Sequence, residues 1–442
     1  MSLKLKSGSA VLITILVASP ACADRWNYGS RLSLNSDWND NPSLANEDFN
    51  PESTFRFLAV YDGIWERRAT DTRFNLRPRF TTDYYPDSKF SNLSATDYFL
   101  PGSFSYQRPL TIWNLGFNAA KQSVLSSEET ISQGSPIGVL QGDDTLTQIS
   151  LTPSLSWQIT EKDELTAGLN YGMTDYALEF TNRSDTTNVG GNFSYSRRLS
   201  ERHAVGFSGF ISTSDSDRRA RIPVSVDPPT DPPTLTILEG EVTTNTDSYY
   251  LTADYDYAFS ETSALRISYG LQDSTTESTT EINLTGQTRS TGSLSFNSTT
   301  FNVAYQTELQ RAKYSIEASR IVTLDITTGQ PQDRYQLEFD GQYALTKRLL
   351  GGWRLIAWTQ EAVALEALDE NNLPTNFSSQ LTFASAEFRL DWNLTRKWYI
   401  NSRYEYRWRK TDQSINDFNQ NLTAVSNQLT IGVTYLWKEL PR

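Results

Sequence analysis

The sequence predicts an all-β protein: a transmembrane antiparallel up-and-down β-barrel of about 18 strands. Three observations support this fold. Segments of about 10–14 residues alternate between apolar and polar side chains. Aromatic residues gather at the ends of these segments, and the connections alternate between short turns and longer polar loops. Only a closed barrel lets strands lie in lipid without unpaired backbone edges.

The alternation is clearest in two segments, 249–259 (YYLTADYDYAF) and 398–409 (WYINSRYEYRWR). Nearly every second residue there is large and apolar or aromatic, which gives a strand one dry and one wet face. A soluble antiparallel sheet with one buried face would show the same period. The segments are longer than the usual soluble strand of about five or six residues. Tyr and Trp at their ends also resemble the girdles at a membrane interface, so the barrel is favoured.

The composition excludes several other classes of protein. Aromatic residues make up 12 % of the chain, which argues against disorder. The mean hydropathy is −0.50, and no apolar run of about 18 residues follows the N-terminus, which excludes a bundle of membrane helices. One Cys and one His leave little for disulfides, zinc or Cys/His catalysis. We therefore expect no enzyme activity, no metal and no cofactor, and we expect His203 to be a solvated turn residue.

The first 23 residues have the features of a secretory signal peptide. Lys4 and Lys6 precede an apolar stretch at 10–18, and Ala21-Cys22-Ala23 fits a cleavage site. Cleavage near Ala23 leaves 24–442, which we predict to be a single barrel domain in the bacterial outer membrane. Cys22 has a rival interpretation as a lipoprotein cysteine, which the preceding Pro disfavours. The net charge of −13 disfavours nucleic acid as a partner.

The connections set the strand count. Short turns are predicted near 67–70, 107–110, 160–163, 200–203, 260–263, 310–313, 346–349 and 395–397. Longer polar loops are predicted at 39–52, 85–94, 123–145, 177–184, 214–246, 273–295, 327–331, 362–376 and 411–421. Together these connections give 18 strands, or 16 if two of the shorter loops are not real, with both chain ends on the short-turn side. Pro78 and Pro153 lie within strands on the predicted lipid face, and each should mark a bulge or lie near a rim.

A barrel of this size encloses water, so inward polar residues are candidates for a solute pathway. Alternation assigns a basic wall near the closing seam, formed by Arg31, Arg56, Arg77, Arg79, Arg403, Arg407 and Arg409. It assigns an acidic wall opposite, formed by Asp254, Asp256, Glu308, Glu338, Asp340, Glu387 and Asp391. Two such walls would place an electric field across the lumen and select charged solutes.

Each of these assignments has an alternative. Arginines and carboxylates inside a wide barrel can instead pair into a solvated lattice, with no net field. Tyr250 and Tyr399, together with Trp358, are candidates to point inward and stack on sugar rings, but aromatic residues in such strands also serve as girdles or packing. The proline-rich segment 214–246 either folds inward as a constriction or stands outside the barrel.

The stretch 26–67 (WNYGSRLSLNSDWNDNPSL, then STFRFLAVYDGIWER) carries a family resemblance. A first strand leads to Asp37, then to Asp40-Asn41 and Pro42, before a second aromatic strand. This arrangement resembles the bacterial outer-membrane barrels of the beta-barrel porin 2 type, which are associated with exopolysaccharide synthesis and export. The resemblance implies export of an exopolysaccharide through the outer membrane. It assigns no functional residues.

The expected function is passive passage of an exopolysaccharide, in one version an anionic one, through an outer-membrane channel. The alternatives are a structural or binding barrel with a closed lumen, and a generic diffusion porin for small solutes. The expected partners are outer-membrane lipid, the outer-membrane assembly machinery, the polysaccharide and periplasmic export proteins.

Overall fold

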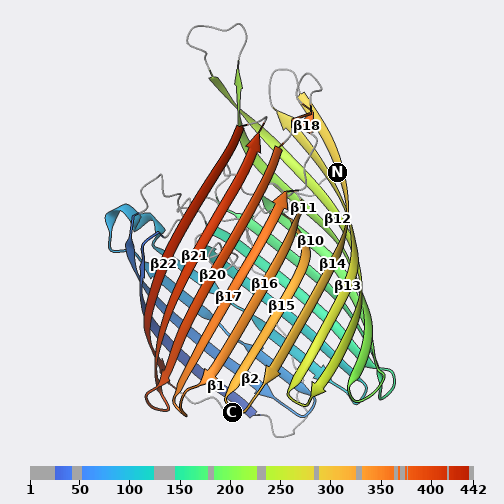
Figure 1. The fold of residues 1–442 in the computed structure, drawn as a ribbon, viewed down its shortest axis with the longest axis vertical. Helices are drawn as coiled ribbons and strands as arrows, with labels where there is room; N and C mark the ends of the chain where they lie inside the picture. Colours follow the sequence, from blue (N-terminus) through green and yellow to red (C-terminus); the bar gives the residue numbers. More distant parts are fainter. Residues whose placement is uncertain are drawn as a thin grey trace.

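The computed structural model describes residues 25–41, 52–123, 145–177, 184–225, 235–282, 288–324, 331–362, 367–368, 374–375, 377–415 and 418–437. The predicted signal peptide, 1–23, lies outside these residues. The described chain forms an antiparallel sheet that closes into a tilted barrel (Figure 1). Among the described residues, no helix is long and apolar enough to cross a bilayer.

The N-terminal half of the barrel contains ten strand segments and one short helix. Their bounds are β1 (Arg25–Asn39), β2 (Thr54–Arg68), β3 (Thr72–Leu76), β4 (Arg79–Tyr84), η2 (Ser88–Leu93), β5 (Ala95–Phe99), β6 (Gly102–Gln107), β7 (Thr111–Ser123), β8 (Thr145–Gln158), β9 (Asp163–Tyr176) and β10 (Asp185–Arg198). Near η2, the exposed Lys89 lies 2.7 Å from Glu52, and this hydrogen bond and the carboxylate charge raise the pKa of Lys89.

The C-terminal half continues the sheet with longer strands. Their bounds are β11 (His203–Ser225), β12 (Leu235–Ser260), β13 (Ser263–Ile282), β14 (Thr288–Glu308), β15 (Ala312–Leu324), β16 (Pro331–Ala344), β17 (Leu349–Ala362), β20 (Phe377–Asn393), β21 (Trp398–Ile415) and β22 (Phe418–Leu436). β18 (Ala367–Leu368) and β19 (Pro374–Thr375) form a separate two-stranded sheet.

The barrel has 18 strands, as the connections predict. The main sheet contains 20 segments, but β3 and β4 lie end to end along β2, and β5 and β6 lie end to end along β7. Each of these pairs is one barrel strand interrupted at a proline, Pro78 or Pro101. β1 pairs with β22 and closes the barrel.

Pro78, predicted to mark a bulge or lie near a rim, interrupts the strand between β3 and β4, but the register along β2 does not shift there. It has no N–H to donate, and its carbonyl oxygen accepts a hydrogen bond of 2.7 Å from the backbone N–H of Gly63 on β2. A Cβ atom on Gly63 would lie 3.0 Å from the Pro78 ring, so a larger residue there would require the ring to shift. Pro153 behaves differently: β8 continues through it, and only the ladder to β9 skips Thr152 and Pro153.

The outer face of the barrel is apolar. Leu169, Ile211, Leu251 and Leu271 are each more than half exposed, which shows that nothing in the described chain covers them. Near the short turns the outward residues become aromatic: Trp26, Trp65, Trp113, Trp157, Phe259, Tyr343, Trp392, Trp398 and Trp437. An apolar band bounded by aromatic residues is the surface of a membrane-spanning barrel.

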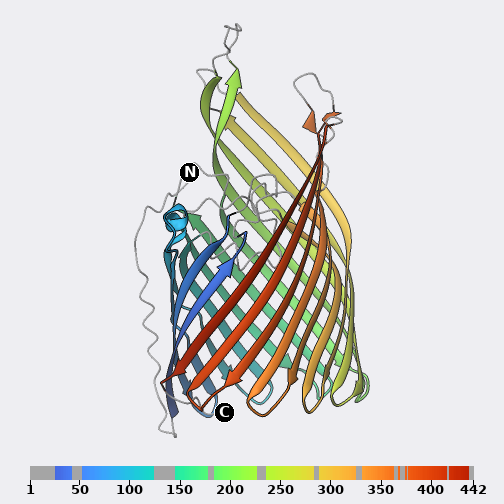
Figure 2. The same ribbon diagram turned by 60° about the vertical axis from the view of Figure 1, so that its left-hand side comes forward.

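The prediction of a loop at 214–246 is wrong. β11 and β12 run through most of it as a hairpin, and their ladder continues from Ser214↔Thr246 to Ser225↔Leu235. The predicted loops 273–295 and 411–421 are likewise largely strand. Hydroxyl groups pair across these extensions, as between Thr246 and Thr276 at 3.1 Å. Figure 2 shows that the strands of this region rise well above the rest of the rim on one side.

Polar side chains fasten the closing seam at its long-loop end. The Asp40 carboxylate accepts from the backbone N–H of Asn427 at 2.6 Å and from its side-chain amide at 2.7 Å. Asn41 donates to the Val425 carbonyl oxygen at 2.8 Å, and Ser426 donates to Asn39 at 2.8 Å. The Asp40-Asn41 pair, which carries part of the family resemblance, thus lies where the first and last strands meet.

Candidate functional site

The strands turn their polar faces toward the lumen, so the predicted wall residues share the face opposite the apolar band. On β2, for example, Phe55, Phe57 and Trp65 are exposed on the outside, whereas Arg56 and Asp62 occupy the alternate positions. The ladders carry this alternation around the barrel, and both Arg77 and Arg79 fall on the inner face with Asp62.

Two seam arginines share one carboxylate. Arg31 Nη2 lies 2.6 Å from Asp62 Oδ2, and Arg79 Nε lies 2.5 Å from Asp62 Oδ1. Asp62 stands directly opposite Arg31 on β1 and opposite Arg79 on β4. The two guanidinium side chains are still 44 % and 48 % exposed, so both remain accessible to a solute while bound to Asp62.

Three of the other seam arginines also contact acids, whereas Arg77 donates to the side-chain oxygen of Asn75 at 3.3 Å. Arg56 lies 2.7 Å from Asp37 and 3.7 Å from Asp83, and its side chain is largely buried. On β21 the Glu405 carboxylate accepts from two arginines, Arg403 at 2.5 Å and Arg407 at 2.8 Å. Arg403 also lies 3.6 Å from Glu387 on β20.

The acids of the opposite wall have basic neighbours too. Asp256 lies 2.7 Å from Arg266, Glu338 lies 2.7 Å from Arg354, and Glu308 lies 3.5 Å from Lys313. Asp254 accepts hydrogen bonds from Ser268 at 2.6 Å and Ser208 at 3.4 Å. Pairs of this kind are the arrangement that the lattice alternative describes, and the electric field across the lumen stays a prediction.

The exceptions are carboxylates without a cation. Within the described parts of the chain, neither Asp340 nor Asp391 forms an ion pair. Asp391 faces a recess of about 520 Å³ in the inner wall at the seam. The recess is lined by Arg31, Ser33, Asn35, Val60, Arg79, Asp391, Tyr399, Asn401, Thr434 and Leu436.

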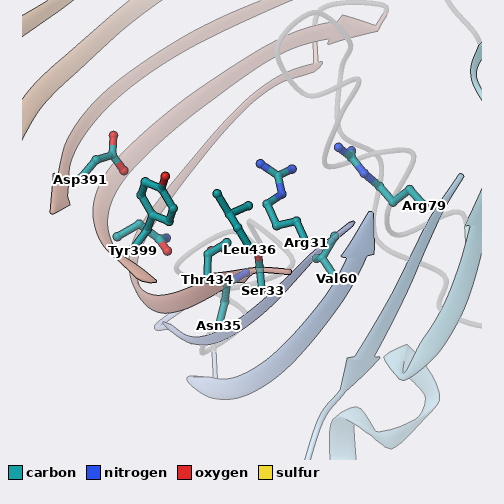
Figure 3. Close-up of a pocket in the computed structure, with 10 residues that line it drawn as sticks. Arg31, Ser33, Asn35, Val60, Arg79, Asp391, Tyr399, Thr434 and Leu436 are labelled. Carbon is teal, nitrogen blue, oxygen red and sulfur yellow. Dashed lines mark hydrogen bonds between the residues drawn. The ribbon is translucent and has the colours of Figure 1, made fainter. Parts of the chain in front are cut away.

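Figure 3 shows how this seam recess is arranged, with Arg31 and Arg79 on one side and Asp391 and Tyr399 on the other. β1, β2 and β4 contribute the first side, while β20 and β21 contribute the second. The recess therefore offers two guanidinium groups, a free carboxylate and a phenol ring to one solute. Tyr250 lies on the inner face of β12, outside this recess.

A second inner cluster is apolar and was only partly anticipated. The Trp358 ring on β17 stacks on Phe383 of β20 with centroids 5.3 Å apart, and both are 3 % exposed. The guanidinium carbon of Arg334 on β16 lies 4.5 Å from the centroid of the Trp358 ring. Ile356, Leu381 and Ala424 complete the cluster. Trp358 points inward, as the sequence suggested, but it is packed rather than open.

His203, expected to be a solvated turn residue, begins β11 beside the short turn and is half-buried. Its Nδ1 lies 2.8 Å from the Tyr255 hydroxyl, and its ring centroid lies 4.9 Å from that of Tyr257. It therefore extends the aromatic surface near the short turns. No group of three or more His, Cys, Asp or Glu side chains that could hold a metal occurs in the described ranges.

The residues that sequence reasoning missed are mainly the partners. Asp62 and Asp83 share a strand face with predicted arginines, and that spacing was a visible signal. The alternation did place Glu405 inward, as an acid within the basic wall. Arg266 and Arg354 oppose the predicted acids on the neighbouring strand, which only the register reveals.

No family model matches the sequence, and no curated protein matches it. Solved structures with a similar arrangement of strands include the ferric-catecholate import receptor Fiu of E. coli K12, with a TM-score of 0.48 and 10 % identity over 93 % of this chain and 82 % of that one. OccAB3 of Acinetobacter baumannii has a TM-score of 0.41 and 8 % identity over 93 % and 100 % of the two chains. OpdQ of Pseudomonas aeruginosa has a TM-score of 0.42 and 8 % identity over 93 % of this chain and 98 % of that one.

Likeness at this level concerns the fold alone and carries nothing about solute. The class of the protein follows from its own geometry: a closed antiparallel barrel of 18 strands, apolar outside and polar inside, with aromatic residues near the short turns. These are the features of outer-membrane β-barrels.

Proposed function

We propose that the protein forms a passive channel across the bacterial outer membrane and that it passes an exopolysaccharide. The observation that carries the proposal is the seam recess in the inner wall. Arg31, Arg79 and Tyr399 all line it, among other polar side chains. Barrels of 16–18 strands are wide enough for an aqueous path. The guanidinium groups suit carboxylate or sulfate groups on a sugar chain, and the phenol ring suits the apolar face of a sugar ring.

In this proposal the protein moves solute and catalyses no reaction. Its partners are the membrane lipid, the assembly machinery that inserts barrels, and periplasmic proteins that deliver the polysaccharide. The secretory signal at 1–23 directs export, and cleavage near Ala23 yields the mature chain. The family resemblance at 26–67 supports the polysaccharide as cargo.

A second candidate is a binding barrel with a closed lumen. Several inward side chains are almost fully buried, including Asp97 and Ser426 at 1 % and Trp358 at 3 %. Burial of this degree on an inner wall favours a lumen that is filled at those levels. A small-solute diffusion porin has no specific observation in its favour.

Recording from purified protein in a planar bilayer separates the candidates. Stepwise conductance is expected, with block by an anionic polysaccharide such as polygalacturonate at lower concentration than by neutral dextran of equal length. Equal block by both polymers would remove the anionic cargo, and block by neither would favour the small-solute porin. A membrane that stays silent at every voltage would reject transport and leave the binding barrel.

A further inference from the structure

The short turns of the barrel share one local structure. In five of them a hydroxyl residue at the strand end accepts from backbone N–H groups two or three residues later: Thr160, Ser200, Ser260, Thr346 and Thr395. The distances lie between 3.0 and 3.2 Å. Such a turn is fixed by its hydroxyl and leaves the next two side chains free to vary.

The charges on these turns divide the rim into two sectors. The mixed sector has Glu first, as in Glu161-Lys162 and Glu201-Arg202. The basic sector has two cations, Lys347-Arg348 and Arg396-Lys397, and the neighbouring turn adds Arg311. All five of these basic side chains are exposed.

The three turns of the basic sector lie side by side. The Arg311 carbonyl oxygen accepts from Ala344 N at 2.7 Å, and the Arg348 carbonyl oxygen accepts from Asn393 N at 2.8 Å. Successive turns are separated by two strand spacings, or about 10 Å. The sector is therefore an arc about 20 Å long, visible as the orange-to-red turns at the bottom of Figure 1.

Among the described residues, no carboxylate forms an ion pair with these five cations. Glu308, on the strand before Arg311, lies 3.5 Å from Lys313 instead. Asp340 and Asp391 belong to the same strands, but both point into the lumen.

The aromatic girdle directly borders the basic sector. Trp398 follows Lys397 in the chain and is 45 % exposed, and Trp392 on the preceding strand is 49 % exposed. Because the turns are so short, the cations lie within a few ångströms of the ring level, which is the level of lipid headgroups. Basic residues at this level attract the anionic headgroups of membrane lipids.

We propose that the basic sector, Arg311, Lys347, Arg348, Arg396 and Lys397, binds the phosphodiester headgroups of anionic phospholipids in the leaflet that contacts the short turns. The geometry favours lipid over a protein partner because the charges lie at the membrane surface and not on a projecting loop. The proposal rests on the membrane placement of the barrel but not on conductance through it.

The test compares full-length mature protein in nanodiscs of phosphatidylethanolamine alone and of phosphatidylethanolamine with one-third phosphatidylglycerol. Phosphatidylglycerol is expected to raise the thermal unfolding midpoint by several degrees. Native mass spectrometry should show retained phosphatidylglycerol in preference to phosphatidylethanolamine. The double variant Lys347→Glu/Arg396→Glu should lose both effects, with at least fivefold less retained lipid.

The mixed sector supplies the matched control. Lys162→Glu/Arg202→Glu removes the same charge from turns of the same structure, and the preference for phosphatidylglycerol should persist. The basic-sector variant itself copies the Glu-first order of the other turns, so it should fold, which heat-modifiable migration on gels checks. Inorganic phosphate added to phosphatidylethanolamine discs should not stabilise the protein.

Three outcomes would overturn the proposal: no preference for phosphatidylglycerol, equal loss in both double variants, or full stabilisation by phosphate alone. Conductance recorded from the same preparations keeps the two proposals separate, because the double variant is expected to leave it unchanged. An acidic periplasmic protein bound by the wild type with no lipid preference would reassign the sector to a protein partner.

Discussion

Two carboxylates of the inner wall, Asp62 and Glu405, each bind two arginines. Asp62 is the clearest case, since it holds Arg31 and Arg79 from the strands on either side. Its face could be predicted from alternation along β2. Its partners could not, because they depend on the register between strands and on the closure of the barrel.

Replacement of Asp62 by asparagine leaves both guanidinium groups without a counter-charge. We expect the free energy of unfolding to fall by about 1–3 kcal/mol, because Arg31 and Arg79 lose their hydrogen bonds to a charged carboxylate. The reversal potential in a salt gradient should also shift toward anions. Urea titration of folded protein in detergent and bilayer recording measure the two effects.

Asp391→Asn is the control for this change. It removes one negative charge from the recess that Arg31 and Arg79 line but breaks no ion pair among the described residues. The reversal potential should shift in the same direction, while stability stays within about 0.5 kcal/mol of the wild type. Equal destabilisation by both variants would contradict the role assigned to Asp62.

At the scale of the elements, alternation located the strands that cross the membrane but not the ends of those that leave it. β11 to β14 continue far past the apolar band, where both faces meet water. The apolar period disappears there, and a run of Thr and Ser such as 274–280 then resembles a loop. The strands persist because β-branched residues and cross-strand hydroxyl pairs suit the sheet, as Ser248 and Ser274 show at 2.9 Å.

The upper hairpin of β11 and β12 should be dispensable for the barrel. Asp217 and Thr243 are cross-strand partners, so 218–242 can be replaced by an Asn-Gly turn. The shortened protein is expected to show the same heat-modifiable migration and the same unfolding midpoint, because no residue of the apolar band is removed. Failure to fold would mean that the hairpin contributes to assembly.

The two hydrogen bonds between Asp40 and Asn427, here called the seam clamp, should contribute to the stability of the closed barrel. Asp40→Ala removes two hydrogen bonds to Asn427 at the long-loop end of the β1–β22 pairing that closes the barrel. The expected cost is about 1–3 kcal/mol of unfolding free energy. Asp412→Ala, on the outer face of β21, breaks only a partly exposed pair with Lys410 and is the control, so it should change stability by less than about 0.5 kcal/mol. If Asp40→Ala leaves the free energy of unfolding unchanged in a urea titration, the clamp does not stabilise the barrel.

At the scale of the whole molecule, the division between a dry outside and a wet inside is the property from which the fold follows. The sequence predicts that division, the 18 strands, and the placement of the first and last strand ends beside the short turns. It can do so because the alternation of period two is visible within each strand by itself. The seam recess and the Trp358 cluster are not local, since each joins residues from strands far apart in the chain.

A single arginine on either side of one strand tests this division. Ile316 on β15 points outward and is 43 % exposed, and Ser315 beside it points inward, opposite Asp340. Ile316→Arg should destabilise the barrel by about 2–4 kcal/mol, the cost of a cation near the bilayer midplane. Ser315→Arg should be neutral or stabilising, because it gains Asp340 as a partner. If Ser315→Arg destabilised the protein more than Ile316→Arg in a urea titration, the assignment of outer and inner faces would be wrong.

The one-sided height of the rim has a consequence for access. β12 has 26 residues, so it is on the order of 85 Å long, against an apolar band about 25 Å tall. With a tilt of about 40°, its upper end stands roughly 40 Å clear of the lipid. This screen covers one flank of the mouth and leaves the other open, as Figure 2 shows. Large molecules can therefore reach the opening only from the side where the rim is low. Antibodies against 243–247, on the high side, should label intact cells.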